Sequence, residues 1–427
     1  MIQSVKGMRD ILPPSSAVWN QVEEAARRVF ARFNYHEIRT PVLEETALFS
    51  RSVGEETDIV SKEMYTFEDR DGSSLTLRPE ATASVLRAYI EHRMDQQPGV
   101  RKLYYMGPMF RRERPQKGRF RQFYQIGAEA IGSDSPAIDA EVIEMVVGIL
   151  EELGIRDFQL LINSVGSKES RARYNEALRA ELKEVAPKMC EDCRRRAETN
   201  PLRVLDCKVP QDQPIIEQLP SILDYLNQED REHFLRVREF LDDRSIRYTV
   251  KPRLVRGLDY YARTTFEITH GALGAQNAIL GGGRYDGLAE SLGSKVPAPG
   301  IGFSIGEDRL VMTVEEGGTV EPRRLDLYIA PMGDLALRHC AILAGEIRKR
   351  NVSVEIGTER KLRRMMELAN KLAARFTLIV GDNEIVTQSY TLKDMTTGEQ
   401  ETLTRQELLE QFQREAAARE RAPIVNA

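Results

Sequence analysis

Three residues at alternate positions, Gln125, Gly127 and Glu129, share one face of a predicted strand, because side chains alternate between the two faces of a strand. A glycine between an amide and a carboxylate leaves open floor on which a polar ligand could lie. The stretch therefore predicts a binding surface that offers hydrogen bonds and negative charge.

The segment before this surface is basic. An apolar run, LYYMGPMF, enters a loop that contains Arg111, Arg112, Arg114, Lys117, Arg119 and Arg121. The pattern predicts an antiparallel hairpin with a positively charged tip. The alternative is an ordinary solvated hairpin.

The composition sets the frame for this hairpin. The chain has 427 residues, which predicts two or three domains, and 41% apolar with 30% charged residues is typical of a globular protein. The net charge of −5 means that any nucleic-acid contact must come from local basic patches. The N-terminus lacks a signal-peptide pattern and no apolar run is long enough to span a bilayer, so we expect a cytoplasmic protein without membrane segments.

Four cysteines are too few for a disulfide framework in a chain of this length. Cys190 and Cys193 form a CxxC pair and Cys207 follows, but no fourth Cys or His ligand is near in sequence. The sequence therefore predicts reduced thiols on a helical hairpin and no metal site formed by protein side chains.

The N-terminal half carries a helix, an edge strand and a hairpin. A helix with Val18, Val22, Ala25, Val29 and Phe33 on one stripe should end at Asn34. The following IRTPVLEE should be a strand at a sheet edge or a subunit boundary, since Pro41 cannot donate a ladder hydrogen bond. Homodimerisation is one explanation of such an edge, and an ordinary capped edge is the other.

A second candidate site follows Pro79, where a strand–turn–strand unit ends and a helix should open. We expect Glu80 and Thr82 in the first helical turn, where an acidic side chain complements the helix dipole. Helix capping alone explains such a glutamate. The more demanding hypothesis is that both side chains offer oxygens to a substrate ammonium group.

The second half predicts an inserted helical module at about residues 167–243, then glycine-rich strands, a linker, and a separate C-terminal domain. No Walker A or GxGxxG fingerprint is present. The C-terminal pattern is β-α-β-α-β with a terminal hairpin. Its basic residues could contact RNA phosphates or simply form a solvated helix face, and they are Arg360, Lys361, Arg363, Arg364 and Lys371.

Several motifs together resemble those of the class II aminoacyl-tRNA synthetases. IRTPVLEE resembles the first class signature, GPMFRRERPQKGRFRQF the second, and GIGFSIGEDRL, ending in Arg309, the third. LVRGLDYYARTTFE and GGGRYDGL resemble the two signatures of the histidyl-tRNA synthetase family, and KGMRDILPP and LRPEAT match its N-terminal half. The resemblance covers essentially the whole chain. Ala81 departs from the glycine of many relatives, at a position that contributes only backbone.

The resemblance implies an α+β catalytic domain at residues 1–322, with a mainly antiparallel sheet of six to seven strands flanked by helices, and a C-terminal α/β anticodon-binding domain at residues 323–427. It implies a homodimer that joins L-histidine to tRNA-His through histidyl-adenylate, with ATP and Mg²⁺. Arg111 and Arg256 would be catalytic, and ATP would be bound by Arg111, Glu113, Arg256 and Arg309. Arginines suit this task because they pair bidentately with phosphate.

The resemblance also assigns the other two substrates. The histidine pocket would be formed by Glu80, Ala81, Thr82, Gln125, Glu129, Tyr260, Tyr261 and Tyr285, and the tRNA acceptor end would contact Gln116, Lys117 and Arg119. A rival hypothesis is a catalytically inactive, histidine-binding regulatory subunit of histidine biosynthesis. Such relatives typically lack the C-terminal domain and have degraded signatures, whereas the three signature arginines are present here.

Overall fold

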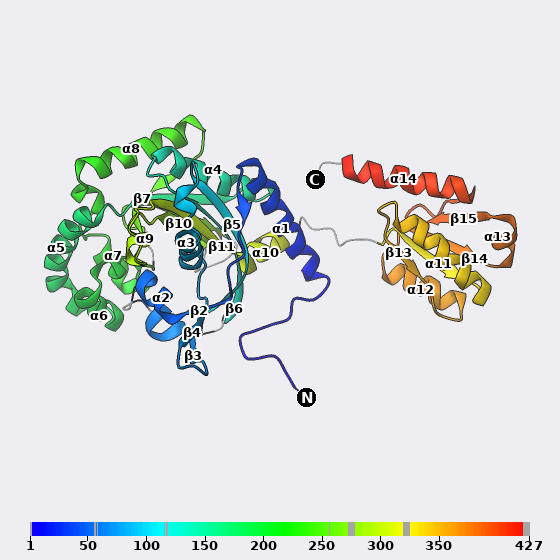
Figure 1. The fold of residues 1–427 in the computed structure, drawn as a ribbon, viewed down its shortest axis with the longest axis horizontal. Helices are drawn as coiled ribbons and strands as arrows, with labels where there is room; N and C mark the ends of the chain where they lie inside the picture. Colours follow the sequence, from blue (N-terminus) through cyan, green and yellow to red (C-terminus); the bar gives the residue numbers. More distant parts are fainter. Residues whose placement is uncertain are drawn as a thin grey trace. The chain divides into compact units, whose positions relative to one another are not determined.

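The computed structural model describes residues 2–54, 57, 59–114, 116, 118–255, 257–271, 278–318 and 325–421. The chain divides into two compact units, Met1–Val320 and Glu321–Ala427 (Figure 1). Each unit has its own hydrophobic core.

The first unit is built on an eight-stranded sheet in the order β1-β5-β6-β11-β10-β9-β7-β8. The six central strands are antiparallel, and the two edge strands pair in parallel with their neighbours. The strands are β1 (His36–Glu37), β5 (Arg101–Phe110), β6 (Gln122–Ile131), β7 (Phe158–Ser164), β8 (Thr249–Val250), β9 (Ala262–His270), β10 (Ala278–Arg284) and β11 (Gly300–Gly306).

The class II synthetase architecture predicted from the sequence is confirmed, with one correction. The sheet is mixed and has eight strands instead of six to seven. The difference lies at the edges, where β1 and β8 are only two residues long. Segments so short carry no alternation of apolar and polar residues, so their sequences gave no signal.

Helices cover both faces of this sheet. The main core joins the sheet to α1 (Ser15–Arg32), α4 (Pro136–Glu152), α8 (Gln228–Asp243) and α10 (Glu307–Glu316). The opposite face packs against α3 (Thr82–Glu91) and α9 (Leu288–Ser291). Ile126 and Ala128 point into the main core, so the alternate residues Gln125 and Glu129 point to the α3 side.

A small three-stranded sheet, ordered β2-β4-β3, lies beside α2 (Thr46–Val53) and the π-helical turn η1 (Ile59–Glu63). Its strands are β2 (Leu43–Glu45), β3 (Tyr65–Glu68) and β4 (Ser74–Leu77). The strand expected across IRTPVLEE is therefore shorter than predicted. Pro41 precedes β2, which agrees with the poor fit of proline to a ladder.

The segment between β7 and β8 is helical, as the sequence predicted. Its elements before α8 are α5 (Lys168–Val185), η3 (Ala186–Lys188), α6 (Glu191–Thr199), η4 (Pro201–Asp206), η5 (Pro210–Asp212), α7 (Gln213–Ile216) and η6 (Ile222–Tyr225). They enclose a core of their own around Tyr174, Leu178 and Cys193. Across the described parts of the chain, no helix has the length and apolarity needed to cross a membrane.

The second unit is an α/β domain with sheet order β13-β12-β14-β15-β16. The first three strands in this order are parallel and the last two form an antiparallel hairpin, as predicted. Its elements are β12 (Leu327–Pro331), α11 (Asp334–Arg348), β13 (Val354–Ile356), α12 (Leu362–Lys371), β14 (Phe376–Val380), α13 (Asp382–Thr387), β15 (Ser389–Asp394), β16 (Gln400–Thr404) and α14 (Arg405–Arg421). The sequence interpretation missed α13 and α14.

Candidate active site

Two adjoining cavities open on the α3 side of the large sheet. The smaller has a volume of about 220 Å³ and the larger of about 420 Å³. Their linings share Arg111, Gln125, Gly257, Gly281 and Ser304. The first cavity holds carboxylates and tyrosines, whereas the second holds most of the basic residues, so the shared wall separates two chemically different chambers.

The floor of the smaller cavity is made of glycines on β10 and β11. Gly283 pairs with Gly302, and Gly281 pairs with Ser304, so the residues lie side by side on one face. A Cβ added at Gly302 would lie 1.8 Å from Oε2 of Glu129. Only the absence of side chains leaves this space.

The open floor expected over Gly127 is not there. The ring of Tyr105, which faces Gly127 across the β5–β6 ladder, fills that position, and an added Cβ would lie 2.3 Å from it. Gly127 therefore admits an aromatic ring from the neighbouring strand. The sequence identified the correct face of β6, but the glycine floor lies on the next two strands of the sheet, β11 and β10.

Glu129 lies at the centre of the smaller cavity and is held from two sides. Thr82 Oγ1 donates a 2.7 Å hydrogen bond to its Oε1, and Tyr285 Oη donates a 2.7 Å hydrogen bond to its Oε2. The carboxyl group is 1% exposed. Burial raises its pKa to about 8, although the two hydroxyl donors act in the opposite direction.

Glu80 precedes α3 instead of lying in its first turn, which corrects the prediction. Its two carboxylate oxygens accept the backbone N–H groups of Thr82 (2.8 Å) and Ala83 (2.9 Å). Glu80 thus caps the helix and also lines the cavity. Burial raises its pKa above the ordinary value, and the two backbone donors oppose this shift.

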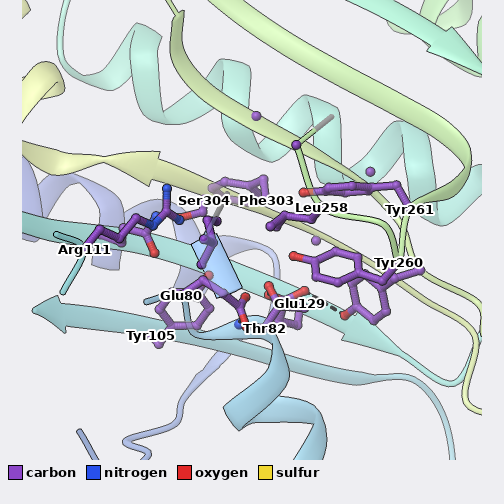
Figure 2. Close-up of a pocket in the computed structure, with 17 residues that line it drawn as sticks. Glu80, Thr82, Tyr105, Arg111, Glu129, Leu258, Tyr260, Tyr261, Phe303 and Ser304 are labelled. Carbon is purple, nitrogen blue, oxygen red and sulfur yellow. Dashed lines mark hydrogen bonds between the residues drawn. The ribbon is translucent and has the colours of Figure 1, made fainter. Parts of the chain in front are cut away.

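Tyrosine rings enclose the smaller cavity (Figure 2). The ring centroid of Tyr260 lies 4.8 Å from that of Tyr261 and 6.1 Å from that of Tyr285, the latter pair edge-on. In Figure 2, Arg111 lies at one end and the Tyr260–Tyr261 pair at the other, with Glu80, Thr82 and Glu129 between them. The chamber therefore has a cationic end, an acidic middle and an aromatic end.

The larger cavity contains three of the four predicted ATP-binding residues, Arg111, Glu113 and Arg309. Arg111 Nε donates to the carbonyl of Pro79 (2.9 Å), and Arg309 Nη1 donates to the carbonyl of Ala278 (2.7 Å). Glu113 accepts a 2.8 Å hydrogen bond from Arg119. Burial lowers the pKa of Arg309, with Arg119 as the next cause. The chamber therefore brings three arginines together with four acidic side chains, which are Glu113, Asp206, Glu267 and Asp308.

Some predicted residues lie elsewhere. Ala81 is fully buried and contacts the α3-side core without lining the cavity. Gln116 is exposed and bridges to Arg119, which lines the larger cavity. Arg256 and Lys117 lie outside the described residues. In the second unit, Arg360 and Lys361 precede α12, and Arg363 pairs with Glu367 on its exposed face.

Sequence reasoning missed Tyr105, Ser304, Glu267 and the pair Asp206–Lys208, all of which line the cavities. Glu267 lies on β9 between Phe266 and Ile268, an alternation that could have identified it, whereas Tyr105 lies in an apolar run of β5 that carries no such signal. Asp206 and Lys208 come from the helical segment inserted between β7 and β8. Nothing in their local sequence connects them to the sheet.

Comparisons with known proteins agree with this geometry. A family model described as "Histidyl-tRNA synthetase" matches residues 7–310, and one described as "Anticodon binding domain" matches residues 326–415. The chain is 69% identical to the histidine–tRNA ligase of Solibacter usitatus, over 96% of this chain and 98% of that protein. It is 56% identical to that of Koribacter versatilis, over 96% and 95% of the two chains.

Solved structures show the same relationship. The apo histidyl-tRNA synthetase of Staphylococcus aureus superposes with a TM-score of 0.81 at 41% identity, covering 97% of this chain and all of that one. A protein of Bacillus halodurans, described as an ATP phosphoribosyltransferase regulatory subunit/histidyl-tRNA synthetase, has a TM-score of 0.66 at 20% identity over 89% of this chain and 98% of that one, and so shares the fold. The two-chamber site, the two matched family models and the full-length relatives show that this chain belongs to the histidyl-tRNA synthetase family.

Proposed function

We infer that the protein catalyses the ATP-dependent attachment of L-histidine to tRNA. In the first step the histidine carboxylate attacks the α-phosphorus of ATP, which gives histidyl-adenylate and releases diphosphate. In the second step the terminal adenosine of the tRNA attacks the acyl carbon and AMP leaves. The observation that carries this proposal is the pair of joined chambers, one lined by carboxyl groups and tyrosines and one by arginines together with acidic side chains, which share Arg111 as a wall.

The smaller chamber fits histidine by charge and shape. The substrate brings an α-ammonium group and an imidazole into a space with two buried carboxyl groups, Glu80 and Glu129. We assign the ammonium to Glu80, Thr82 and Gln125. The buried Gln125 Oε1 supports this assignment, because it has no hydrogen-bond partner among the described residues.

We assign the imidazole to Glu129 and Tyr261, with Tyr260 and Tyr285 around it. Glu129 can accept a hydrogen bond from a ring N–H, and Thr82 and Tyr285 fix its orientation. A cationic substrate also favours the ionised form of the buried carboxyl groups, since an opposite charge offsets the desolvation that raises their pKa.

The larger chamber fits the triphosphate. Arg111 would pair with the α-phosphate next to the histidine carboxylate, and Arg309 with the γ-phosphate. Glu113 lies between Arg111 (3.7 Å) and Arg119 (2.8 Å), which orients both guanidinium groups. Arg256, assigned to the α-phosphate by its signature alone, completes the set.

ATP in this family is used with a divalent metal ion, and we propose Mg²⁺. The carboxylates of Glu113 and Glu267 line the larger chamber and are oxygen ligands of the type that Mg²⁺ prefers. When bound, the ion would neutralise negative charge on the diphosphate leaving group.

The remaining proposals concern assembly and tRNA. We propose that Gln116, Lys117 and Arg119 contact the acceptor end, that the C-terminal unit binds the anticodon region, and that the enzyme is a cytoplasmic homodimer. Family membership and the matched anticodon-binding model support the tRNA partner. Gln116 is exposed, so its side chain is accessible to a tRNA.

The regulatory-subunit hypothesis has less support. The two relatives at 69% and 56% identity are described as histidine–tRNA ligases, while the regulatory-type protein shares only the fold. Histidine-dependent exchange of labelled diphosphate into ATP tests the distinction, together with charging of tRNA-His. We expect both activities. Histidine binding without exchange would support the regulatory hypothesis instead.

A further inference from the structure

Three thiols and a carboxylate lie close together in the helical segment between β7 and β8. None of the four residues lines either substrate chamber. Their four potential ligand atoms all lie within 4.8 Å of one another, and the residues are Cys190, Cys193, Cys207 and Asp212. Cys190 is the N-cap of α6 and Cys193 lies in its first turn. Cys207 follows η4, and Asp212 ends η5.

The distances within this cluster suit a tetrahedral ion. Cys190 Sγ lies 3.9 Å from Cys207 Sγ, and Cys207 Sγ lies 3.3 Å from Asp212 Oδ2. With zinc–sulfur bonds of about 2.3 Å and zinc–oxygen bonds of about 2.1 Å, tetrahedral angles place two sulfurs roughly 3.8 Å apart and a sulfur and an oxygen roughly 3.6 Å apart. These two pairs therefore have nearly the spacing of a zinc coordination shell, and all four groups lie within 4.8 Å of one another.

The carboxylate of Asp212 is the second observation that points to a cation. Asp212 is fully buried, and among the residues described no Lys, Arg or His forms an ion pair with it. Its partners are the N–H of Cys190, 3.2 Å from each oxygen, and the thiol of Cys207. Burial of a carboxylate without a counter-charge is costly, and a bound cation would offset that cost.

Backbone donors surround the sulfurs in the way that thiolate ligands require. The N–H of Cys193 donates to Cys190 Sγ at 3.4 Å, and the N–H of Val209 donates to Cys207 Sγ at 3.4 Å. Such hydrogen bonds delocalise the negative charge of ligating thiolates and fix their orientation. Cys190 is only partly buried, which leaves an entry path for the ion.

We propose that Cys190, Cys193, Cys207 and Asp212 bind one Zn²⁺ ion as a closed structural site. This replaces the expectation of plain reduced thiols, which rested on the lack of a fourth Cys or His. The fourth ligand is an aspartate, five residues after Cys207 and indistinguishable in sequence from a surface acid. A Cys190–Cys207 disulfide would use only two of the four converging groups.

The site would also support the larger substrate chamber. Cys207 stands between Asp206 and Lys208, which both line that chamber. An ion bound to Cys207 fixes the backbone from which these two side chains project. The zinc proposal itself does not depend on the proposed function.

The test is the metal content of the full-length protein, purified without chelator and dialysed, measured by inductively coupled plasma mass spectrometry. We expect about one zinc per chain. Cys193→Ser and Asp212→Asn should each lower this content several-fold. Cys340→Ser is the matched control, since Cys340 is a buried cysteine in the second unit, and it should keep the full content.

A second measurement uses the wild-type protein, so it does not depend on how the variants fold. After exchange of the ion for Co²⁺, we expect the visible absorption of tetrahedral cobalt together with ultraviolet thiolate-to-metal charge-transfer bands. The proposal is overturned if the wild-type protein neither contains nor takes up zinc or cobalt. It is also overturned if non-reducing mass spectrometry finds a Cys190–Cys207 disulfide, or if Cys193→Ser retains the wild-type metal content.

Discussion

The hydroxyl of Tyr285 donates a 2.7 Å hydrogen bond to Oε2 of Glu129, a residue 156 positions earlier in the chain. Thr82 holds the other oxygen of the same carboxylate. The carboxylate, which we assign to the imidazole, is thus held by residues from two segments that are both distant in sequence from its own strand.

Tyr285→Phe should weaken histidine binding while it leaves ATP binding close to normal. The variant removes a donor to a buried carboxylate, and hydrogen bonds to charged groups contribute about 1.5–3 kcal/mol, which corresponds to roughly 10- to 100-fold in affinity. The measurement is the KM for each substrate in diphosphate exchange. Tyr174→Phe is the control, because the hydroxyl of Tyr174 donates to the carbonyl of Pro220 within the inserted helices. Equal losses for histidine and ATP would contradict the assignment.

Gly302→Ala should strongly reduce histidine activation. The new methyl group would lie 1.8 Å from Glu129 Oε2 and 2.6 Å from the carbonyl of Ala128, so the carboxylate must move. We expect a loss of at least about 100-fold in exchange, since misplacement of a positioning group by an ångström has effects of this size. Gly345→Ala is the control, because nothing lies within 4 Å of its added Cβ on α11. Wild-type exchange by Gly302→Ala would show that the glycine floor is dispensable.

The stability of the ligand-free protein should fall as the pH rises from about 5 to 8. Glu129 keeps its proton up to a pKa of about 8 in the folded state, whereas in the unfolded chain it loses the proton near its ordinary value of 4.5. The folded state binds more protons in this window, so the free energy of unfolding decreases with pH, by up to about 1.4 kcal/mol per pH unit for this group.

Glu129→Gln tests this contribution, because the amide does not titrate and should flatten the pH dependence. Urea unfolding at several pH values measures it. Glu290→Gln, an exposed residue on α9, should retain the wild-type slope. A slope unchanged in Glu129→Gln would mean that this carboxyl group is ionised across the window.

A chain that ends at Val320 should form histidyl-adenylate and charge tRNA poorly. The first unit contains both substrate chambers and its own core, whereas tRNA charging gains affinity from a second, remote contact. Diphosphate exchange and aminoacylation, each at several salt concentrations, separate the two functions. If the truncated chain charges tRNA as well as the full chain, with the same dependence on salt, the C-terminal unit does not anchor the tRNA.

Much of the fold followed from local patterns. The α1 stripe, the β3–β4 hairpin and the passage from β11 into α10 at Gly306 are signalled by periodicity and turn residues within a few positions. The two-residue edge strands and α14 carried weaker signals. Such elements are determined by the partners that they pack against, and a local pattern does not contain those partners.

The candidate site likewise contains some residues that a local pattern identified and others that depend on distant parts of the chain. Gln125 and Glu129 were found because alternation puts them on one face, and the family signatures supplied Arg111 and Arg309. The role of Gly127 was misplaced because the ring of Tyr105, from the adjacent strand, occupies its space. Asp206 and Lys208 reach the site through a folded insertion. These are relationships between distant segments, which no single stretch specifies.

The double anchoring of Glu129 bears on the accuracy of translation. An amino acid of similar size without a polar ring would leave this buried carboxyl group, together with its two hydroxyl donors, facing an apolar surface. Sites built to hydrogen-bond their substrate reject such analogues by about 10⁴–10⁵, which is enough to make proofreading unnecessary. Misacylation would therefore be prevented when the amino acid first binds, because the two hydrogen bonds keep the carboxyl group of Glu129 oriented toward the substrate.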